Sequence, residues 1–159
     1  MHAVVRLNSL LFHLAVPILA GSISSQISGN AAAAYASLTL PGFAPPAILF
    51  PIVWTLLYLL MGLSAYLITT DRTISPQERR SALLLYGLML VINCLWSPLF
   101  FRFHLYTLSA WWCVLLVGVT ALTAAVFFRI RAAAGLLYLP VLLWLVFACV
   151  LNFAVAYLN

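Results

Sequence analysis

The segment from Pro41 to Thr70 contains no charged residue, and this constrains the fold more than any other feature of the chain. Pro45 and Pro46 lack the backbone N–H that a helix interior requires, so they favour the start of a helix. The residues after them form an apolar run of the length that crosses a bilayer, which takes about 20 residues as a helix. The segment therefore predicts a transmembrane helix.

The composition extends this prediction to the whole chain. Hydrophobic residues make up 67% of the 159 residues and charged residues 6%, whereas soluble domains carry about 25% charged residues. Nine charged residues are also too few for the polar face of an amphipathic surface helix or of a porin-type lumen. We expect an all-α integral membrane protein, a single domain built as a bundle of five transmembrane helices. The approximate spans are 7–28, 46–70, 81–101, 106–128 and 134–158.

The first span is the least regular of the five. Polar residues and Pro17 interrupt it, and its apolar centre at 10–20 also fits the hydrophobic region of a signal peptide cleaved near Ala20. Both alternatives stay open at this point. If the span is retained, small residues such as Gly21 and Ser25 predict close packing against neighbouring helices.

The positive charges predict the orientation of the bundle. All seven basic residues are arginines. With five spans, one side of the membrane carries Arg6, Arg72, Arg79, Arg80, Arg129 and Arg131, and the other carries Arg102. The positive-inside rule then predicts a cytoplasmic N-terminus and a C-terminus on the outside. Because the arginines are scattered rather than gathered in a stripe, no nucleic-acid partner is expected.

The connection at 28–46 is long and uncharged, and it lies on the predicted outer side. Long connections in compact domains often act as lids. We expect this one, which carries Tyr35, to fold over the outer end of the bundle.

Three of the five tryptophans share predicted helix faces with polar or small residues. Trp54 and Tyr58 lie on one face of the second span, Asn93 and Trp96 on one face of the third, and Trp144 on the fifth. Aromatic walls with a few polar groups are typical of a small-molecule pocket, here between the second, third and fifth spans. A flat aromatic ligand suits such walls because rings stack in offset geometry.

Two alternatives qualify the pocket. Trp111 and Trp112, at the outer start of the fourth span, fit an interfacial aromatic belt. The amide of Asn93 requires a hydrogen-bond partner in the hydrocarbon core, and either a neighbouring helix or a ligand satisfies it.

The three cysteines, Cys94, Cys113 and Cys149, lie within apolar runs and have no disulfide or metal-ligand spacing. We interpret them as small packing residues and expect no metal site.

At these positions the sequence resembles the translocator protein family, also called TspO/MBR or tryptophan-rich sensory proteins. The resemblance extends from about Tyr35 to Asn159 and rests on three segments: PGFAPPAILFPIVWTLLYLLMG, NCLWSPLFF and LPVLLWLVFACVLN. It implies a five-helix bundle, usually a homodimer in the membrane lipid. It also implies a pocket in the outer half, capped by the first loop, that binds porphyrins such as protoporphyrin IX and haem, with no required cofactor.

The resemblance also assigns candidate ligand-binding residues by their match to the family's pocket positions. They are Tyr35, Pro45, Pro46, Trp54, Tyr58, Asn93, Trp96, Ser97, Cys113, Trp144, Phe147 and Ala148.

Some positions depart from the family pattern. Met89 stands where the family has a glutamine and Trp112 where it has an acidic residue, so the expected pocket is less polar than usual. At the C-terminus Phe153 and Tyr157 replace the tyrosine and basic residue of the animal cholesterol pattern. This disfavours sterol binding by that route and favours a bacterial cell membrane as the location.

The leading functional hypothesis is a porphyrin receptor or sensor. Passive transport of tetrapyrroles is an alternative, whereas ion coupling is disfavoured because the central spans contain no Asp, Glu, Lys or Arg. The resemblance also allows light-dependent porphyrin degradation. The sequence has no nucleophile–base pair or paired carboxylates, so such chemistry would be that of the ligand. A purely structural membrane protein remains the simplest alternative.

Overall fold

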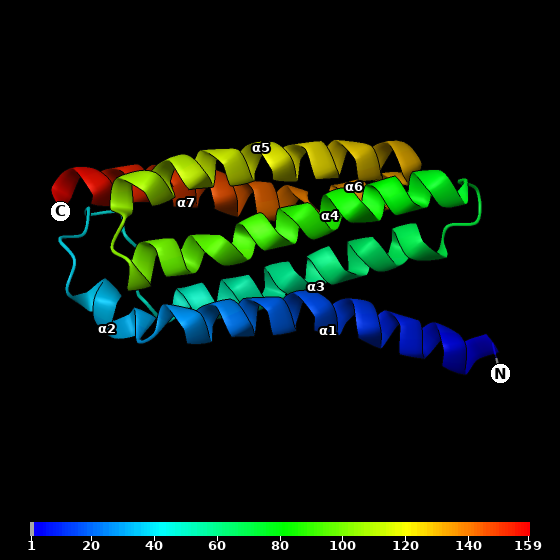
Figure 1. Cartoon of the computed structure of the whole chain (residues 1–159), viewed down its shortest axis with the longest axis horizontal. Helices are drawn as coiled ribbons and strands as arrows, with labels where there is room; N and C mark the ends of the chain where they lie inside the picture. The colour runs from blue at the N-terminus through cyan, green and yellow to red at the C-terminus, as the bar shows by residue number, and fades with distance from the viewer. Residues whose placement is uncertain (1) are drawn as a thin grey trace.

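A computed structural model describes residues 2–159 of the chain, with side chains described from Leu7 onward. Long helices run side by side along one axis, with the two termini at opposite ends (Figure 1). These helices are α1 (His2–Ser28), α3 (Leu49–Thr70), α4 (Pro76–Ser97), α5 (Tyr106–Ile130) and α7 (Leu139–Leu158). Three short elements complete the chain: α2 (Ala31–Ala36), the π-helical turn η1 (Pro98–Arg102) and α6 (Ala132–Leu136).

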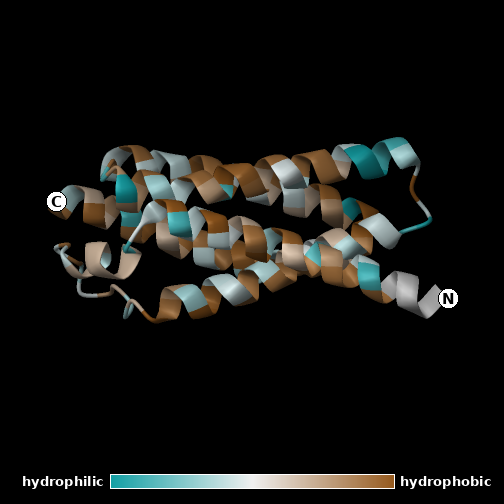
Figure 2. Ribbon diagram, turned by 60° about the horizontal axis from the view of Figure 1, so that its bottom comes forward, coloured by the Kyte–Doolittle hydropathy of each residue, from teal (hydrophilic) through white to brown (hydrophobic). Residues whose placement is uncertain are grey.

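The outer surface of the bundle is apolar. Five segments of the described chain are long and apolar enough to cross a membrane. Hydrophobic residues dominate the length of the long helices, and strongly hydrophilic residues lie mostly near their ends (Figure 2). Large side chains such as Phe12, Leu56 and Leu143 face outward, the last with 74% of its surface exposed. Lipid solvates such a surface, whereas water does not. The predicted all-α fold is confirmed, and the protein crosses the membrane several times.

The helices pack in a fixed order. α1 lies along α3, α5 lies along α7, and α4 contacts both α1 and α5. The contact between α1 and α3 is close because Gly62 has no side chain: a Cβ atom there would overlap the backbone carbonyl of His13. Nearby, Nε2 of His13 lies 2.8 Å from the hydroxyl oxygen of Thr69. These contacts fix the first half of α1 against α3.

The two ends of the bundle differ in character. We call one the loop end, because it carries the connection at 29–48, the turn at 103–105 and Asn159 (Figure 1). The opposite end, the basic end, carries the connection at 71–75. Thr73 donates backbone and side-chain hydrogen bonds to Asp71 and lowers the pKa of that carboxyl, and the nearby positive charges of Arg131 and Arg79 lower it further. The side chain of Arg6, which also counts toward the predicted basic side, lies outside the described side chains.

Several helix boundaries differ from the predicted spans. α4 begins at Pro76 because Ser75 and Glu78 form a capping box, each side chain accepting a hydrogen bond from the other's backbone N–H. α3 begins at Leu49, after the proline pair rather than at it. The last span divides into α6 and α7 ahead of Pro140, which cannot donate a helical hydrogen bond and whose ring would clash with the preceding turn.

The tightly packed core is uneven along the bundle. A large cluster of buried residues joins α3, α4, α5 and α7, and it includes Met61, Met89, Phe127, Tyr138 and Leu145. At the loop end the buried cluster is small, with Phe100, Leu151 and Val155 at its centre. The bundle is therefore less completely filled at the loop end.

Candidate ligand-binding site

The main cavity lies at the loop end and has a volume of ≈ 610 Å³. This falls within the range of small-molecule sites, about 300 to 1,000 Å³. Residues of α1, α2, α3, α4 and η1 line it. They include Gly21, Ser22, Ser24, Ser25, Tyr35, Phe50, Pro51, Trp54, Thr55, Tyr58, Asn93, Trp96, Ser97 and Phe101.

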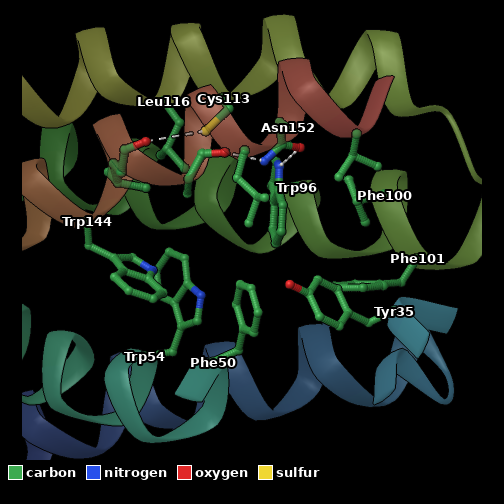
Figure 3. A pocket seen from close by; sticks show the side chains of 14 residues that line it. Tyr35, Phe50, Trp54, Trp96, Phe100, Phe101, Cys113, Leu116, Trp144 and Asn152 are labelled. Carbon is green, nitrogen blue, oxygen red and sulfur yellow. Dashed lines mark hydrogen bonds between the residues drawn. The ribbon is translucent and has the colours of Figure 1, made fainter. Parts of the chain in front are cut away.

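A second and much smaller side pocket adjoins the main cavity (Figure 3). Its walls come from α2, α3, α4, η1, α5 and α7. Its volume of ≈ 20 Å³ is close to the room that one water molecule needs, about 10 to 15 Å³. Side chains therefore nearly fill the space between the second, third and fifth spans, where we expected the pocket. The open volume lies instead on the other side of the aromatic wall, next to α1.

Five aromatic rings separate the two spaces: Tyr35, Phe50, Trp54, Trp96 and Phe101 line both. The rings of Tyr35 and Phe50 meet edge to face, with centroids 5.1 Å apart, and those of Phe50 and Trp144 follow at 6.0 Å. In Figure 3 the indoles of Trp54 and Trp144 lie next to each other on one side of Phe50, with Tyr35 on its other side. The wall thus presents ring surfaces from three segments that are far apart in the sequence.

Neutral hydrogen bonds position the polar side chains of the site. The Asn93 amide donates to the Tyr58 hydroxyl oxygen at 3.3 Å, and the Trp96 indole N–H donates to Oδ1 of Asn152 at 3.2 Å. Asn93 thus joins α4 to α3 and at the same time lines the main cavity. The indole nitrogen of Trp144 is buried without a hydrogen-bond partner among the described residues. Since an unmet buried donor is costly, it is available to an acceptor atom of a ligand or water.

The connection at 29–48 closes the loop end of the cavity, as its position in the sequence predicts. Tyr35 donates a hydrogen bond of 2.9 Å from its hydroxyl to the Pro45 carbonyl. Thr39 and Asn159 are joined by two further hydrogen bonds. Burial raises the pKa of the Tyr35 hydroxyl.

The candidate residues predicted from the family resemblance separate into three groups. Those on the main cavity are Tyr35, Trp54, Tyr58, Asn93, Trp96 and Ser97. Those on the side pocket alone are Cys113, Trp144 and Ala148. Those that line neither space are Pro45, Pro46 and Phe147. Pro45 instead accepts the Tyr35 hydrogen bond, and the ring of Phe147 packs against Trp144 with centroids 5.4 Å apart.

The sequence did not predict that α1 forms one wall of the main cavity. Gly21 and Ser25 predicted close helix packing, and this is correct for Gly21, where a Cβ atom would overlap the ring of Tyr58. Ser25 instead faces the open cavity. Phe50 was also missed, although it precedes Trp54 by one helical turn and therefore shares its face.

The two remaining tryptophans behave differently from each other. Trp111 is 62% exposed on the lipid-facing surface, in agreement with an aromatic belt. Trp112 is half-buried and its indole N–H donates to the Ile92 carbonyl at 2.8 Å. It therefore joins α5 to α4 rather than serving only at the interface.

None of the described residues that line the two spaces is charged. Recognition in this site therefore depends on ring stacking, shape and neutral hydrogen-bonding groups. The arrangement favours a large, flat and mainly apolar ligand.

Comparison with known proteins agrees with this architecture. The sequence profile of the TspO/MBR family matches residues 13–158. The chain is 35% identical to the translocator protein of Sus scrofa over 141 residues, which cover 88% of this chain and 83% of that protein. It is 34% identical to the tryptophan-rich sensory protein of Cereibacter sphaeroides, with 79% and 76% covered, and 32% identical to protein CrtK of Rhodobacter capsulatus, with 79% and 78% covered.

The family match spans the aromatic wall, the helices that position it and most of α1. It confirms the family that the tryptophan-bearing segments indicated. The chain belongs to the TspO/MBR family.

Proposed function

We propose that the protein is a membrane receptor that binds porphyrins, such as protoporphyrin IX or haem, in the main cavity. The observation that carries the proposal is a cavity of ≈ 610 Å³ bordered by the rings of Phe50, Trp54, Trp96 and Phe101. A tetrapyrrole is flat, aromatic and mainly apolar, and it stacks on rings of this kind. The names of two relatives, translocator protein and tryptophan-rich sensory protein, accord with a role in receiving or moving a ligand.

The orientation that we propose places the loop end outside the cell and the N-terminus in the cytoplasm of a bacterium. Arg79 and Arg131 both lie near Asp71. This brings a basic residue from the first turn of α4 together with one from the junction of α5 and α6 at the basic end. Arg79 also donates a hydrogen bond to the Asp71 carbonyl. Such an excess of arginine is typical of the cytoplasmic side of a membrane protein.

The test is a titration of the purified protein in lipid with protoporphyrin IX. Binding is monitored by the absorption band of the porphyrin, because the informative variants remove tryptophan fluorescence. Trp54→Ala combined with Trp96→Ala removes two stacking surfaces, each contributing about 0.5 to 1.5 kcal/mol, so we expect affinity to fall about fivefold or more.

Trp111→Ala is the matched control, because Trp111 faces lipid and lines neither space. It should bind porphyrin as the wild type does. Equal affinity for the wild type and the double variant, with both proteins folded, would reject porphyrin binding in this cavity.

A further inference from the structure

The side of the main cavity that is formed by α1 is less closed than the others, because α1 changes its packing partner along its length. Near the basic end α1 is joined to α3 through His13 and Thr69. Near the loop end it is joined to α4 instead: Ser24 donates a hydrogen bond to the Cys94 carbonyl, and the hydroxyl oxygens of Ser28 and Ser97 lie 2.8 Å apart. α1 therefore crosses from one neighbour to the other along its length.

This crossing opens a gap between α1 and α3 beyond Gly21. At Gly21 the two helices still touch, since a Cβ atom would overlap the ring of Tyr58. One turn further, Ser22 and Ser25 of α1 and Pro51 and Thr55 of α3 line the cavity and are also exposed on the outside of the bundle. A residue with both properties lies at an opening. We call this opening, edged by Ser22, Ser25, Pro51 and Thr55, the lateral window.

Two of the three hydroxyl groups on the edge of the window, those of Ser22 and Thr55, are suited to lipid. Ser22 donates its hydroxyl proton to the Ile18 carbonyl at 2.8 Å, and Thr55 donates its own to the Pro51 carbonyl at 2.7 Å. Polar groups satisfied within their own helix are tolerated in hydrocarbon. The neighbours Ile23, Ile52 and Leu56 are each more than half exposed and apolar. The window therefore opens toward the bilayer core.

The loop end of the cavity, in contrast, is covered by the connection at 29–48, although Ala32, Ala47 and Ile48 of this connection also line the cavity and are exposed. Tyr35 is bonded to the Pro45 carbonyl, and Thr39 exchanges two hydrogen bonds with Asn159. These bonds attach the connection to the rest of the bundle, so they hold the cover of the loop end in place. Across the window, the described residues make no hydrogen bond between Ser22 or Ser25 and α3.

We propose that the lateral window is the entrance of the main cavity, and that a flat lipophilic ligand passes through it sideways from the bilayer core. When no ligand is bound, an acyl chain of a bilayer lipid occupies the window. The identity of the ligand rests on the proposed function, whereas the position of the entrance does not.

A pair of bulky substitutions tests the entrance. Ser22→Phe with Thr55→Phe fills the window, and Ile23→Phe with Leu56→Phe adds the same rings one residue away, on exposed positions that do not line the cavity. Vesicles loaded with protoporphyrin IX are mixed with protein in lipid, and capture and release are followed in time. A gate affects both directions of exchange, so we expect both rates to fall about tenfold or more in the filled variant and to stay unchanged in the control.

The kinetic pattern separates a blocked entrance from a smaller cavity. Loss of binding space speeds release, whereas a blocked entrance slows release as well as capture. Asn159→Ala loosens the loop end, and its exchange rates should match those of the wild type. Wild-type exchange in the filled variant, faster release from it, or faster exchange in Asn159→Ala would each overturn the proposal.

A second measurement requires no porphyrin. Phosphatidylcholine brominated on its acyl chains quenches tryptophans that lipid can reach, and Trp54 lies on the cavity wall. We expect less quenching in the filled variant than in its control, and equal quenching would overturn the proposal. If quenching differs as expected but the wild type binds no porphyrin, the window stands and the proposed function fails.

Discussion

Asn159 and Thr39 are joined by two hydrogen bonds that run in opposite directions. The Thr39 N–H donates to Oδ1 of Asn159 at 2.9 Å, and Nδ2 of Asn159 donates to the Thr39 carbonyl at 3.0 Å. One side chain thus satisfies both backbone groups of a residue in the long connection. It attaches this connection to the end of α7, although the two residues are separated by 120 positions in the sequence.

Replacing Asn159 should therefore loosen the loop end without unfolding the bundle. Asn159→Ala removes both hydrogen bonds, each contributing about 0.5 to 1.5 kcal/mol, so the Thr39 amide should exchange hydrogen about fivefold faster or more. Hydrogen exchange read by mass spectrometry over residues 29–48 measures this. Tyr157→Ala, at an 89% exposed position on the same turn, should leave the exchange rate unchanged.

The close contact of α1 with α3 predicts that alanine substitution at Gly62 lowers stability, whereas the same substitution at Gly118 does not. Gly62→Ala places a Cβ atom on the His13 backbone, which cannot move aside as a side chain can, and should destabilise the protein by about 1 to 3 kcal/mol. Gly118 on α5 has no atom within 4 Å of the added group. Gly118→Ala should be neutral or stabilising by up to about 1 kcal/mol. Thermal unfolding in detergent compares the two, and equal stability would contradict the packing described.

The capping box at the start of α4 is also testable. Ser75→Ala removes the side-chain acceptor for the Glu78 N–H and should lower the free energy of unfolding by about 0.5 to 2 kcal/mol. Gln77→Ala is a suitable control, because Gln77 is exposed in the same turn and lies outside the box. A loss of similar size in both variants would mean that the cap contributes nothing specific.

The raised pKa of Tyr35 predicts how stability changes at alkaline pH. Its hydroxyl is buried and bonded to Pro45, so it should release its proton above the ordinary value of 10.0. The unfolded chain releases this proton at a lower pH than the folded protein does. The contribution of the protonated Tyr35 to folding stability is therefore complete below pH 10 and is lost as pH rises through the folded-state pKa. Tyrosinate absorbance of the wild type minus that of Tyr35→Phe measures the titration. A difference curve centred at or below pH 10 would contradict the burial.

The sequence predicted the number and type of the membrane spans well, because a bilayer allows few alternatives to a helix. The break between α6 and α7 was not predicted, because Leu137 and Tyr138 are as apolar as their neighbours. Pro140 was the available signal, and its effect on the preceding residues was not taken into account.

The candidate site was predictable to the extent that its residues share helix faces. Trp54 and Tyr58, or Asn93 and Trp96, lie together because of helical periodicity alone. The side of the aromatic wall on which the open volume lies depends on the direction of α1, and periodicity carries no information about the crossing of two helices. Small residues such as Ser25 are compatible with either a close contact or an open space.

The crossing of α1 has a consequence for how this architecture diversifies. α1 is bonded to α3 in its first half and to α4 in its second half. Its crossing angle with α3 therefore sets the volume that remains between α1 and the aromatic rings of the main cavity. Larger or smaller side chains at the positions of Gly21, Ser22 and Ser25 would therefore change the size of the ligand that the cavity accepts, without any change to the tryptophans. Sequence variation in the least regular helix is then where differences in selectivity should be sought.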